Sequence, residues 1–295
     1  MIYFGPAGWI YRDWQGVFYP RKKGKAFDPL SFTAQYFDTV EINSSFYYPP
    51  APESAAKWTR RVQTNPNFRF TAKVWQKLTH EREYSQKDVD LFCQSIEPLA
   101  AASKLGALLL QFPWSFRNQE ENRAYLEKLV RSLRDYPLVL EVRHSSWNET
   151  GTFDFLREMG VGFCNIDQPV IGKSLRPTAV VTSPVSYFRM HGRNYKNWFR
   201  DESDVNERYD YLYNSEELEQ AGELIETIAE RSRETYAILN NHRNAQAAAN
   251  ALELKSRVSG KKVAAPQSLL ESYPHLKEFA EAGEVSASQE RRLFD

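Results

Sequence analysis

The chain has 295 residues, of which 42% are hydrophobic and 14% aromatic, so it can bury a large core as one barrel-sized domain or as two ordinary ones. Its 38 basic and 38 acidic residues cancel, which excludes a global field that would draw the protein to nucleic acid or to an anionic membrane. The sequence shows neither a basic segment followed by an apolar stretch at its start nor an apolar run of roughly 18 residues, so we expect a cytoplasmic protein that does not contact the membrane.

Eight short runs of apolar, β-branched or aromatic residues recur along the chain, and helical patterns fill most of the intervals between them. This alternation is typical of βα units with parallel strands. We place strands near residues 2–8, 39–43, 68–74, 107–112, 138–143, 161–166, 186–191 and 236–241. Eight such units predict a single (β/α)8 barrel of the TIM type over residues 1–295, with surrounding helices and a peripheral tail at about 284–295.

Two helices near the C-terminal end carry clear boundary signals. Asn214 followed by Glu217 is typical of an N-cap with its reciprocal partner, and an apolar stripe continues from there to about residue 233. After the last strand, alanines and leucines over 245–254 predict a helix that packs closely on the sheet and stops at Gly260. We expect both helices to lie outside the barrel.

The two connections around the seventh strand are irregular. Residues 169–184 contain no helical pattern, and Ala179 to Thr182 could add a short extra strand. After that strand, Gly192 allows a turn with positive φ, and an extended loop with Arg193, Tyr195 and Trp198 is too long for a mere connection. We expect this loop to act as a lid or a binding loop.

Polar side chains gather where the predicted strands end. Side chains alternate between the two faces of a strand, and α/β barrels keep their chemistry at the carboxyl ends of the strands. Period two predicts an inward layer of Glu41, Asn43, Thr71, Lys73, Gln111, Glu141, Arg143, Asn165, Asp167, Arg189, His191 and Asn241. Its charges nearly balance, which suits a functional pocket and equally suits a structural ion network inside the barrel.

The two cysteines and the aromatic residues near the strand ends could all serve packing rather than chemistry. Cys93 and Cys164 form no Cys-x-x-Cys pair, and we expect both to be reduced and packed in the interior. Aromatic residues crowd the strand ends, where they could stack on a sugar ring or a base or could simply wall the mouth: Trp9, Tyr11, Trp14, Phe46, Tyr47, Tyr48, Trp75, Trp114 and Trp147.

A series of motifs in order along nearly the whole chain resembles one known family. These motifs are Gly8-Trp9, Val40-Glu41-Ile42-Asn43-Ser44-Ser45-Phe46-Tyr47, Phe70-Thr71-Ala72-Lys73, Leu110-Gln111-Phe112-Pro113, Glu141-Val142-Arg143-His144 with Trp147, Arg189-Met190-His191-Gly192-Arg193, Tyr209-Asp210-Tyr211 and Asn240-Asn241-His242. Together they resemble the YecE-like family, domain of unknown function 72. The resemblance implies an eight-stranded barrel and no established general activity.

Acid–base chemistry without a metal fits the inward layer best. Glu41 or Glu141 would act as the base, and His191 would move a proton near neutral pH. Arginine and lysine would clamp a carboxylate or phosphate, so the expected partner is a small anionic molecule such as a phosphorylated sugar or a nucleotide fragment. The predicted substrate-binding residues are Trp9, Asn43, Lys73, Gln111, Arg143, His144, Trp147, Asn165, Asp167, Arg189, Tyr211 and Asn241.

Two alternatives from other classes stay open. A metal-dependent phosphodiesterase or endonuclease would hold a divalent ion with Glu41, Glu141, His144 and His191, but the neighbouring cations compete for those carboxylates, and we predict no cofactor. A non-catalytic nucleic-acid-binding module, which we do not favour, would use a local basic face of Arg60, Arg61, Lys73, Arg193 and Lys196. His80 and His275 lie outside the predicted strands, and we expect surface or packing roles for them.

Overall fold

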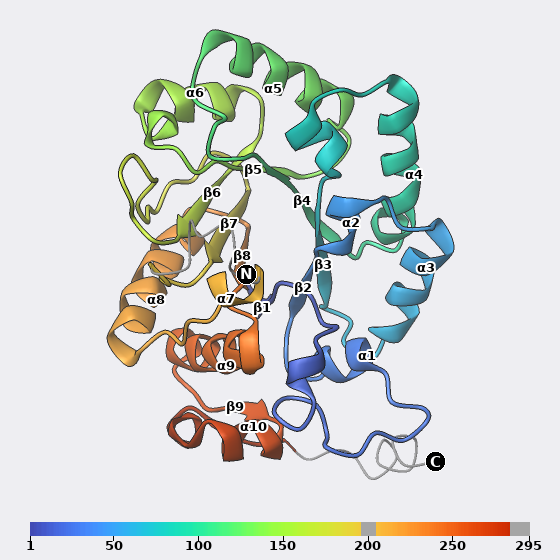
Figure 1. Ribbon diagram of the computed structural model, residues 1–295, viewed down its shortest axis with the longest axis vertical. Coiled ribbons are helices and arrows are strands. Elements are labelled where there is room, and N and C mark those ends of the chain that lie inside the picture. The colour runs from blue at the N-terminus through green and yellow to red at the C-terminus, as the bar shows by residue number, and fades with distance from the viewer. Residues whose placement is uncertain (196–204, 284–295) are drawn as a thin grey trace.

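Eight parallel strands form one nearly closed barrel, as the sequence predicts. A computed structural model describes residues 1–195 and 205–283. The strand order β1-β8-β7-β6-β5-β4-β3-β2 follows the chain around the barrel (Figure 1). The strands are β1 (Ile2–Pro6), β2 (Thr39–Ile42), β3 (Arg69–Lys73), β4 (Leu105–Gln111), β5 (Leu138–Glu141), β6 (Gly162–Asp167), β7 (Val185–Met190) and β8 (Glu234–Leu239). Each lies within two residues of its predicted bounds.

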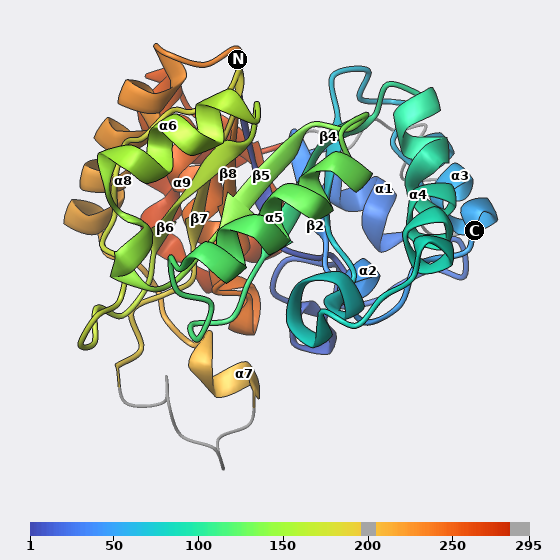
Figure 2. The ribbon, with the colours of Figure 1, turned by 90° about the horizontal axis from the view of Figure 1, so that it is seen from above.

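Helices lie outside the strands, and most connections between consecutive strands contain at least one helix. They are α1 (Pro29–Thr33), α2 (Ser44–Tyr47), α3 (Pro52–Arg61), α4 (Gln86–Ala101), α5 (Glu120–Ser132), α6 (Thr150–Glu158), α7 (Val205–Arg208), α8 (Ser215–Ala229), α9 (Gln246–Ser259) and α10 (Gln267–Ser272). In Figure 2 the N-terminus lies at the top and α7, which follows β7, lies at the bottom. The carboxyl ends of the strands therefore face the viewer in Figure 1.

The two helices with boundary signals form where they are predicted. The Asn214 side chain accepts a hydrogen bond from the Glu217 backbone N–H at 3.0 Å, and Glu217 accepts one from the Asn214 N–H at 3.0 Å, so the capping box is confirmed. Helix α8 ends at Ala229, earlier than residue 233, because the chain turns there to enter β8. Helix α9 ends before Gly260 and packs on β1 and β8.

The connection from β6 to β7 has no helix, and the extra strand predicted at residues 179–182 is wrong. The Asn165 side chain takes the place of a ladder: its Oδ1 accepts hydrogen bonds from the Val180 N–H at 2.8 Å and from Thr178 Oγ1 at 2.7 Å. One further small sheet, β9 (Val263–Ala265) with β10 (Ala280–Ala282), lies beyond α9 and was not predicted. Within the described ranges, no helix has the length and apolar character needed to cross a membrane.

The barrel closes between β1 and β2 through a few contacts rather than a full ladder. The Gly8 N–H donates to the Glu41 carbonyl at 2.9 Å, and the Asp38 N–H donates to the Phe4 carbonyl at 3.1 Å. Gly5 lies at this seam, where a Cβ atom would come within 1.8 Å of the Thr39 carbonyl oxygen. The lack of a side chain at residue 5 therefore lets the first and second strands meet.

Replacing Gly5 by alanine should open this seam. Since the added methyl cannot fit without backbone movement, we expect Gly5→Ala to lower the free energy of unfolding by about 3 kcal/mol. Chemical denaturation would measure the change. The matched control is Gly151→Ala in α6, where nothing lies within 4 Å of the added carbon and stability should stay equal or rise by up to about 1 kcal/mol. Equal stability of the two variants would contradict this account of the seam.

Candidate functional site

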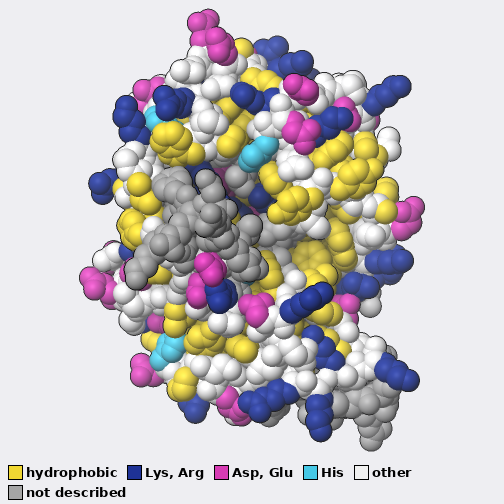
Figure 3. Space-filling view, in the orientation of Figure 1, with side chains coloured by type: hydrophobic (Ala, Val, Ile, Leu, Met, Phe, Trp, Pro, Cys, Tyr) yellow, Lys and Arg dark blue, Asp and Glu magenta, His cyan; other side chains and the backbone are white. Residues whose placement is uncertain are grey.

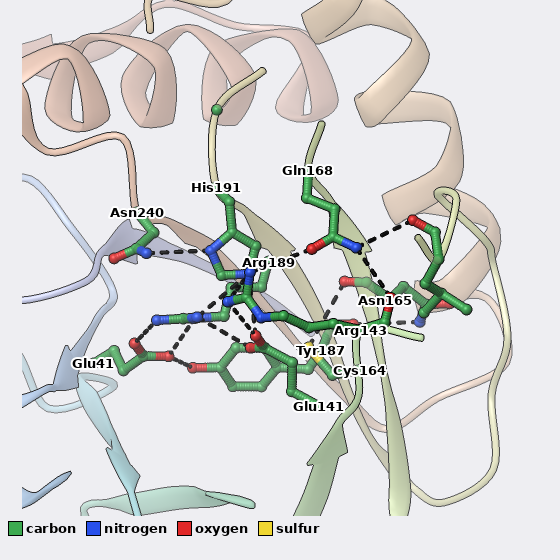
Figure 4. A network of polar contacts seen from close by, with 12 residues as sticks. Glu41, Glu141, Arg143, Cys164, Asn165, Gln168, Tyr187, Arg189, His191 and Asn240 are labelled. Atoms are coloured by element: carbon green, nitrogen blue, oxygen red, sulfur yellow. Dashed lines mark hydrogen bonds and ion pairs between the residues drawn. The ribbon is translucent and has the colours of Figure 1, made fainter. Parts of the chain in front are cut away.

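Strand pairing decides which side chains point into the barrel. On β7 these are Tyr187 and Arg189, followed by His191 just beyond the strand, as predicted (Figure 4). In β6, Cys164 is level with Tyr187, and Ile166 is level with Arg189. Residues that pair in register on neighbouring parallel strands point to the same face of the sheet. The inward residues of β6 are therefore apolar.

The inward projection predicted for Asn165, Asp167 and Asn241 is wrong. Asn165 and Asp167 are level with Phe188 and Met190, which pack against the helices outside the barrel. Asn165 holds the segment after β6, as described above. The Asn241 amide donates to the Tyr211 carbonyl at 2.8 Å and to Asn250 Oδ1 at 2.9 Å.

A buried arginine lies at the centre of the site. Arg189 binds Glu41 through two hydrogen bonds, Nη2 to Oε1 at 2.6 Å and Nε to Oε2 at 3.0 Å, and binds Glu141 Oε2 through Nη1 at 3.0 Å (Figure 4). All three side chains are at most 2% exposed. Burial opposes the charge of Arg189, but the two carboxylates outweigh it and raise the pKa of the guanidinium above its ordinary value.

The floor of the site fixes Glu41 further. Tyr187 Oη donates to Glu41 Oε2 at 2.7 Å, and Thr71 Oγ1 lies 2.8 Å from the same phenol oxygen. Because Tyr187 donates its phenol proton to Glu41, the hydroxyl of Thr71 must be the donor to Tyr187 Oη. Both Glu41 oxygens are therefore occupied by buried donors, which leaves this carboxylate a structural ligand of Arg189.

Glu141 is held as an ion by three neighbours. Its Oε1 lies 2.9 Å from Arg143 Nη2 and 3.2 Å from His191 Nε2, while Arg189 binds Oε2. Burial would raise the pKa of this carboxyl, but Arg189, His191 and Arg143 lower it more, so the pKa lies well below its usual range. A carboxylate of this kind is a weak base.

His191 is a neutral imidazole at physiological pH. The Asn240 side-chain amide nitrogen lies 3.2 Å from Nδ1, and Nε2 lies 3.2 Å from Glu141 Oε1 and 3.3 Å from Arg143 Nη2. Burial first, and then the charge of Arg143, lower the pKa of His191 to about 3. The lowered pKa of His191 opposes the predicted proton exchange near neutral pH, because a buried ring beside two guanidinium groups resists a further positive charge.

Lys73 ends β3 and carries an amine into the mouth of the barrel. Its Nζ lies 4.1 Å from the centre of the Phe46 ring, and its backbone carbonyl accepts a hydrogen bond from Ser45 Oγ at 2.7 Å. Within residues 1–195 and 205–283, no carboxylate forms an ion pair with this amine. Burial and the charge of Arg189 lower the pKa of Lys73 to about 7.

Aromatic residues form one side of the mouth. Gly8, Trp9, Ile10, Tyr11, Asn43, Ser44 and Tyr47 line a cavity of roughly 290 Å³. Trp9 is 7% exposed and packs edge-on against Trp58, whereas Tyr47 is 68% exposed. Hydrophobic side chains gather on the face drawn in Figure 3, over the part of the barrel where α2 lies.

Other predicted residues have packing contacts. Trp147 is fully buried, stacks on Phe116 and donates to its carbonyl at 2.7 Å. His144 accepts from the Ser146 N–H and lies edge-on to Trp114, 4.9 Å between ring centres. Gln111 is level with Glu141 and shares its inward face.

Asp167 and Tyr211 belong to a second polar cluster outside the barrel wall. Asp167 binds Arg193 through Nη2 at 2.6 Å and accepts from Tyr213 Oη at 2.8 Å, and the Tyr211 hydroxyl donates to Glu217 at 2.6 Å. Gly192, with φ of +87°, turns the chain directly after His191, as predicted, and so directs Arg193 toward this cluster. The cluster anchors the segment that precedes α8.

The residues of the predicted basic face lie in different environments. Arg193 is paired with Asp167 and Glu217, Arg61 is paired with Asp28, and Lys73 points into the mouth. Lys196 and Trp198 lie outside the described residues. Among the residues that the structure describes, no three His, Cys, Asp or Glu side chains are grouped as metal ligands.

Some site residues were missed from the sequence. Tyr187, Asn240 and Cys164 lie on the inward face, and Gln168 Oε1 lies 3.3 Å from Arg143 Nη1 (Figure 4). Counting alternate residues back from Arg189 would have found Tyr187, but only strand pairing reveals the others.

His80 packs edge-on against Phe46, 4.9 Å between ring centres, so it contacts the same ring as Lys73.

Comparisons with known proteins agree on one family. The family model described as "Protein of unknown function DUF72" matches residues 3–272. The chain is 29% identical to the UPF0759 protein YunF of Bacillus subtilis, over 86% of this chain and 93% of that protein. It is 27% identical to the UPF0759 protein YecE of Escherichia coli O157:H7, over 58% of this chain and 59% of that protein.

Solved structures give the same result. A crystal structure of a DUF72 family protein from Thermotoga maritima MSB8 superposes with a TM-score of 0.77 and 37% identity, over 88% of this chain and 99% of that one. A DUF72 family protein from Enterococcus faecalis V583 also superposes with a TM-score of 0.77, at 28% identity, over 88% of this chain and 96% of that one. With its barrel fold and its match over residues 3–272, the chain belongs to the DUF72 family of proteins of unknown function.

Proposed function

We propose that the protein is an enzyme that performs acid–base chemistry on a small anionic molecule in the mouth of the barrel, with Lys73 as the group that exchanges the proton. One observation carries this proposal: an amine enters the mouth without a carboxylate partner among the described residues, while both nearby carboxylates are bound by arginine. The carboxylates and His191, for which the sequence predicts proton transfer, are thereby left with positioning roles.

The charges of the inward layer favour an anionic ligand. Glu41 and Glu141 carry two negative charges, and Arg143 and Arg189 carry two positive charges, so these four side chains cancel. The ammonium form of Lys73 then leaves one positive charge in excess. Opposite charge in a low-dielectric pocket attracts an anion more strongly than it would in water. Arg143, whose side chain is 15% exposed, offers a planar donor group for a carboxylate or phosphate at the same mouth.

The pKa of Lys73 allows it both to accept and to donate a proton at neutral pH. A general acid or base works best when its pKa is near the operating pH. The pKa of Lys73 is about 7, that of His191 is about 3, and that of Glu141 lies well below its usual range. Lys73 is therefore the side chain of this group that exists in both forms at neutral pH.

The buried ion network should prove structural. We expect Arg189→Met to lower the free energy of unfolding by about 3–5 kcal/mol at pH 7, because it leaves two buried carboxylates unpaired. Denaturant titration would measure this, and adding Glu41→Gln and Glu141→Gln to the same variant should recover part of the loss.

The loss should also shrink as the pH falls toward about 4. In the native protein the depressed pKa of Glu141 makes the unfolded chain bind protons first, so acid destabilises it. In Arg189→Met the unpaired carboxylates instead bind protons in the folded state, which offsets the loss. A difference in stability that does not change with pH would contradict the structural role.

Anion binding should depend on the charge of Lys73. We expect sulfate, which stays doubly charged across this range, to bind about tenfold more weakly at pH 8 than at pH 6. The reason is that the protonated fraction of a group with a pKa of about 7 falls from about nine-tenths to one-tenth. Isothermal titration calorimetry would measure the affinity.

Two variants control the sulfate experiment. Lys73→Met should bind sulfate weakly and with little dependence on pH, while Lys57→Met, at an exposed position of α3, should behave as the unchanged protein. If Lys73→Met bound sulfate with the same affinity and the same pH profile as the unchanged protein, Lys73 would not be the group that senses the anion.

A further inference from the structure

We infer that Lys73 is a nucleophile as well as a proton carrier, and that it forms an imine with an aldehyde or ketone that also bears an anionic group. This inference rests on the proposed function, because it uses the same mouth and the same anion-attracting charge. It goes beyond that function by naming the substrate class, an anionic carbonyl compound, and by making the bond to the enzyme covalent.

The position of the amine supports the inference first. Lys73 is the last residue of β3, and the hydrogen bond from Ser45 Oγ to its carbonyl at 2.7 Å ties its backbone to the start of α2. The same helix supplies Phe46, whose ring lies 4.1 Å from Nζ. The amine is therefore oriented by a short helix that follows the neighbouring strand, β2, and its side chain is only partly exposed.

The surroundings keep a fraction of this amine neutral. A lysine becomes nucleophilic when it is desolvated and placed beside another cation, because both effects disfavour the ammonium form. Lys73 meets both conditions, since its side chain is half-buried and desolvated, and the charge of Arg189 lowers its pKa further. At pH 7 about half of the Lys73 side chains carry a lone pair, against less than about one in a thousand for an ordinary lysine.

The carboxylates that could quench this amine are held elsewhere. Glu41 uses both oxygens on Arg189 and Tyr187, and Glu141 uses both on Arg189, Arg143 and His191. Their charges still raise the pKa of Lys73, but burial and the charge of Arg189 lower it more. The ion network thus separates the acidic groups of the mouth from its amine, although all belong to one inward layer.

The reaction balances without a cofactor. The ammonium form of Lys73 first loses one proton, and the nitrogen lone pair then attacks the carbonyl carbon to give a carbinolamine. The nitrogen loses a second proton while the oxygen gains two and leaves as water, so the product is a protonated imine. One ammonium ion and one carbonyl group therefore give one iminium ion and one water molecule, and no electron is gained or lost.

The experiment traps the imine by reduction. The full-length protein would be incubated at pH 7 with sodium cyanoborohydride and either glyoxylate, an anionic aldehyde, or formaldehyde, a neutral one, and the modified lysines would be identified by peptide mass mapping. We expect glyoxylate to modify Lys73 at least about tenfold faster than the exposed Lys57 in the same molecule. The preference for Lys73 over Lys57 should be larger with glyoxylate than with formaldehyde.

A conservative variant separates the covalent step from anion binding. Lys73→Arg keeps the positive charge but removes the titrating amine, so it should still bind sulfate, now with little change between pH 6 and pH 8, and should give no adduct at residue 73. Because the mapping of the unchanged protein compares Lys73 with Lys57 directly, the test does not depend on the folding of this variant.

The outcomes distinguish the two proposals. If sulfate binding follows the charge of Lys73 but glyoxylate modifies Lys73 no faster than Lys57, the imine is overturned and the acid–base proposal stands. If sulfate binding is also indifferent to Lys73, both proposals fail. Faster modification of Lys73 by glyoxylate with a charge-dependent sulfate affinity supports both.

Discussion

The structure of the barrel mouth depends on the charge of one buried arginine. Arg189 comes from β7, and it binds Glu41 from β2 and Glu141 from β5, so one guanidinium group joins three strands across the barrel interior. Desolvated charges are costly unless they are paired with good geometry and further hydrogen bonds. Tyr187 from the middle of β7, together with Arg143 and His191 from just beyond β5 and β7, supplies those further contacts.

The arrangement has a chemical consequence because it assigns different work to similar groups. Glu141 gains stability as an anion from the arginines, which lower its pKa, so it gives up the ability to accept a proton near pH 7. The imidazole lies between two guanidinium groups and stays neutral. Burial and the charge of Arg189 lower the pKa of Lys73, and no carboxylate among the described residues forms an ion pair with its amine. Arg189 and His191, at the end of β7, therefore position the other groups, and Lys73, at the end of β3, is the group that can exchange a proton.

Much of this site could be predicted from the sequence, and the errors have one physical source. Glu41, Lys73, Glu141, Arg143, Arg189 and His191 lie inward because alternation within a strand holds and the strands were placed correctly. Period two also predicts Asn165, Asp167 and Asn241 inward, because alternation alone does not tell which face of a strand points to the interior. Only the register against neighbouring strands shows that Cys164 and Asn240 face the interior instead. The pKa of His191 was beyond prediction, since it depends on cations that three-dimensional packing brings to it.

The same reasoning explains why an amine, rather than an imidazole or a carboxylate, is the titrating group here. Beside Arg143 and Arg189, Glu141 is driven to its anion and the buried His191 to its neutral form, so the pKa of each group lies far below 7. A lysine starts from a pKa about 3 units above neutral pH, and burial first, with the charge of Arg189 second, brings the pKa of Lys73 down to about 7. Burial and the neighbouring arginines, which hold Glu141 as an anion and His191 as a neutral ring, therefore leave Lys73 able to change its protonation state near pH 7.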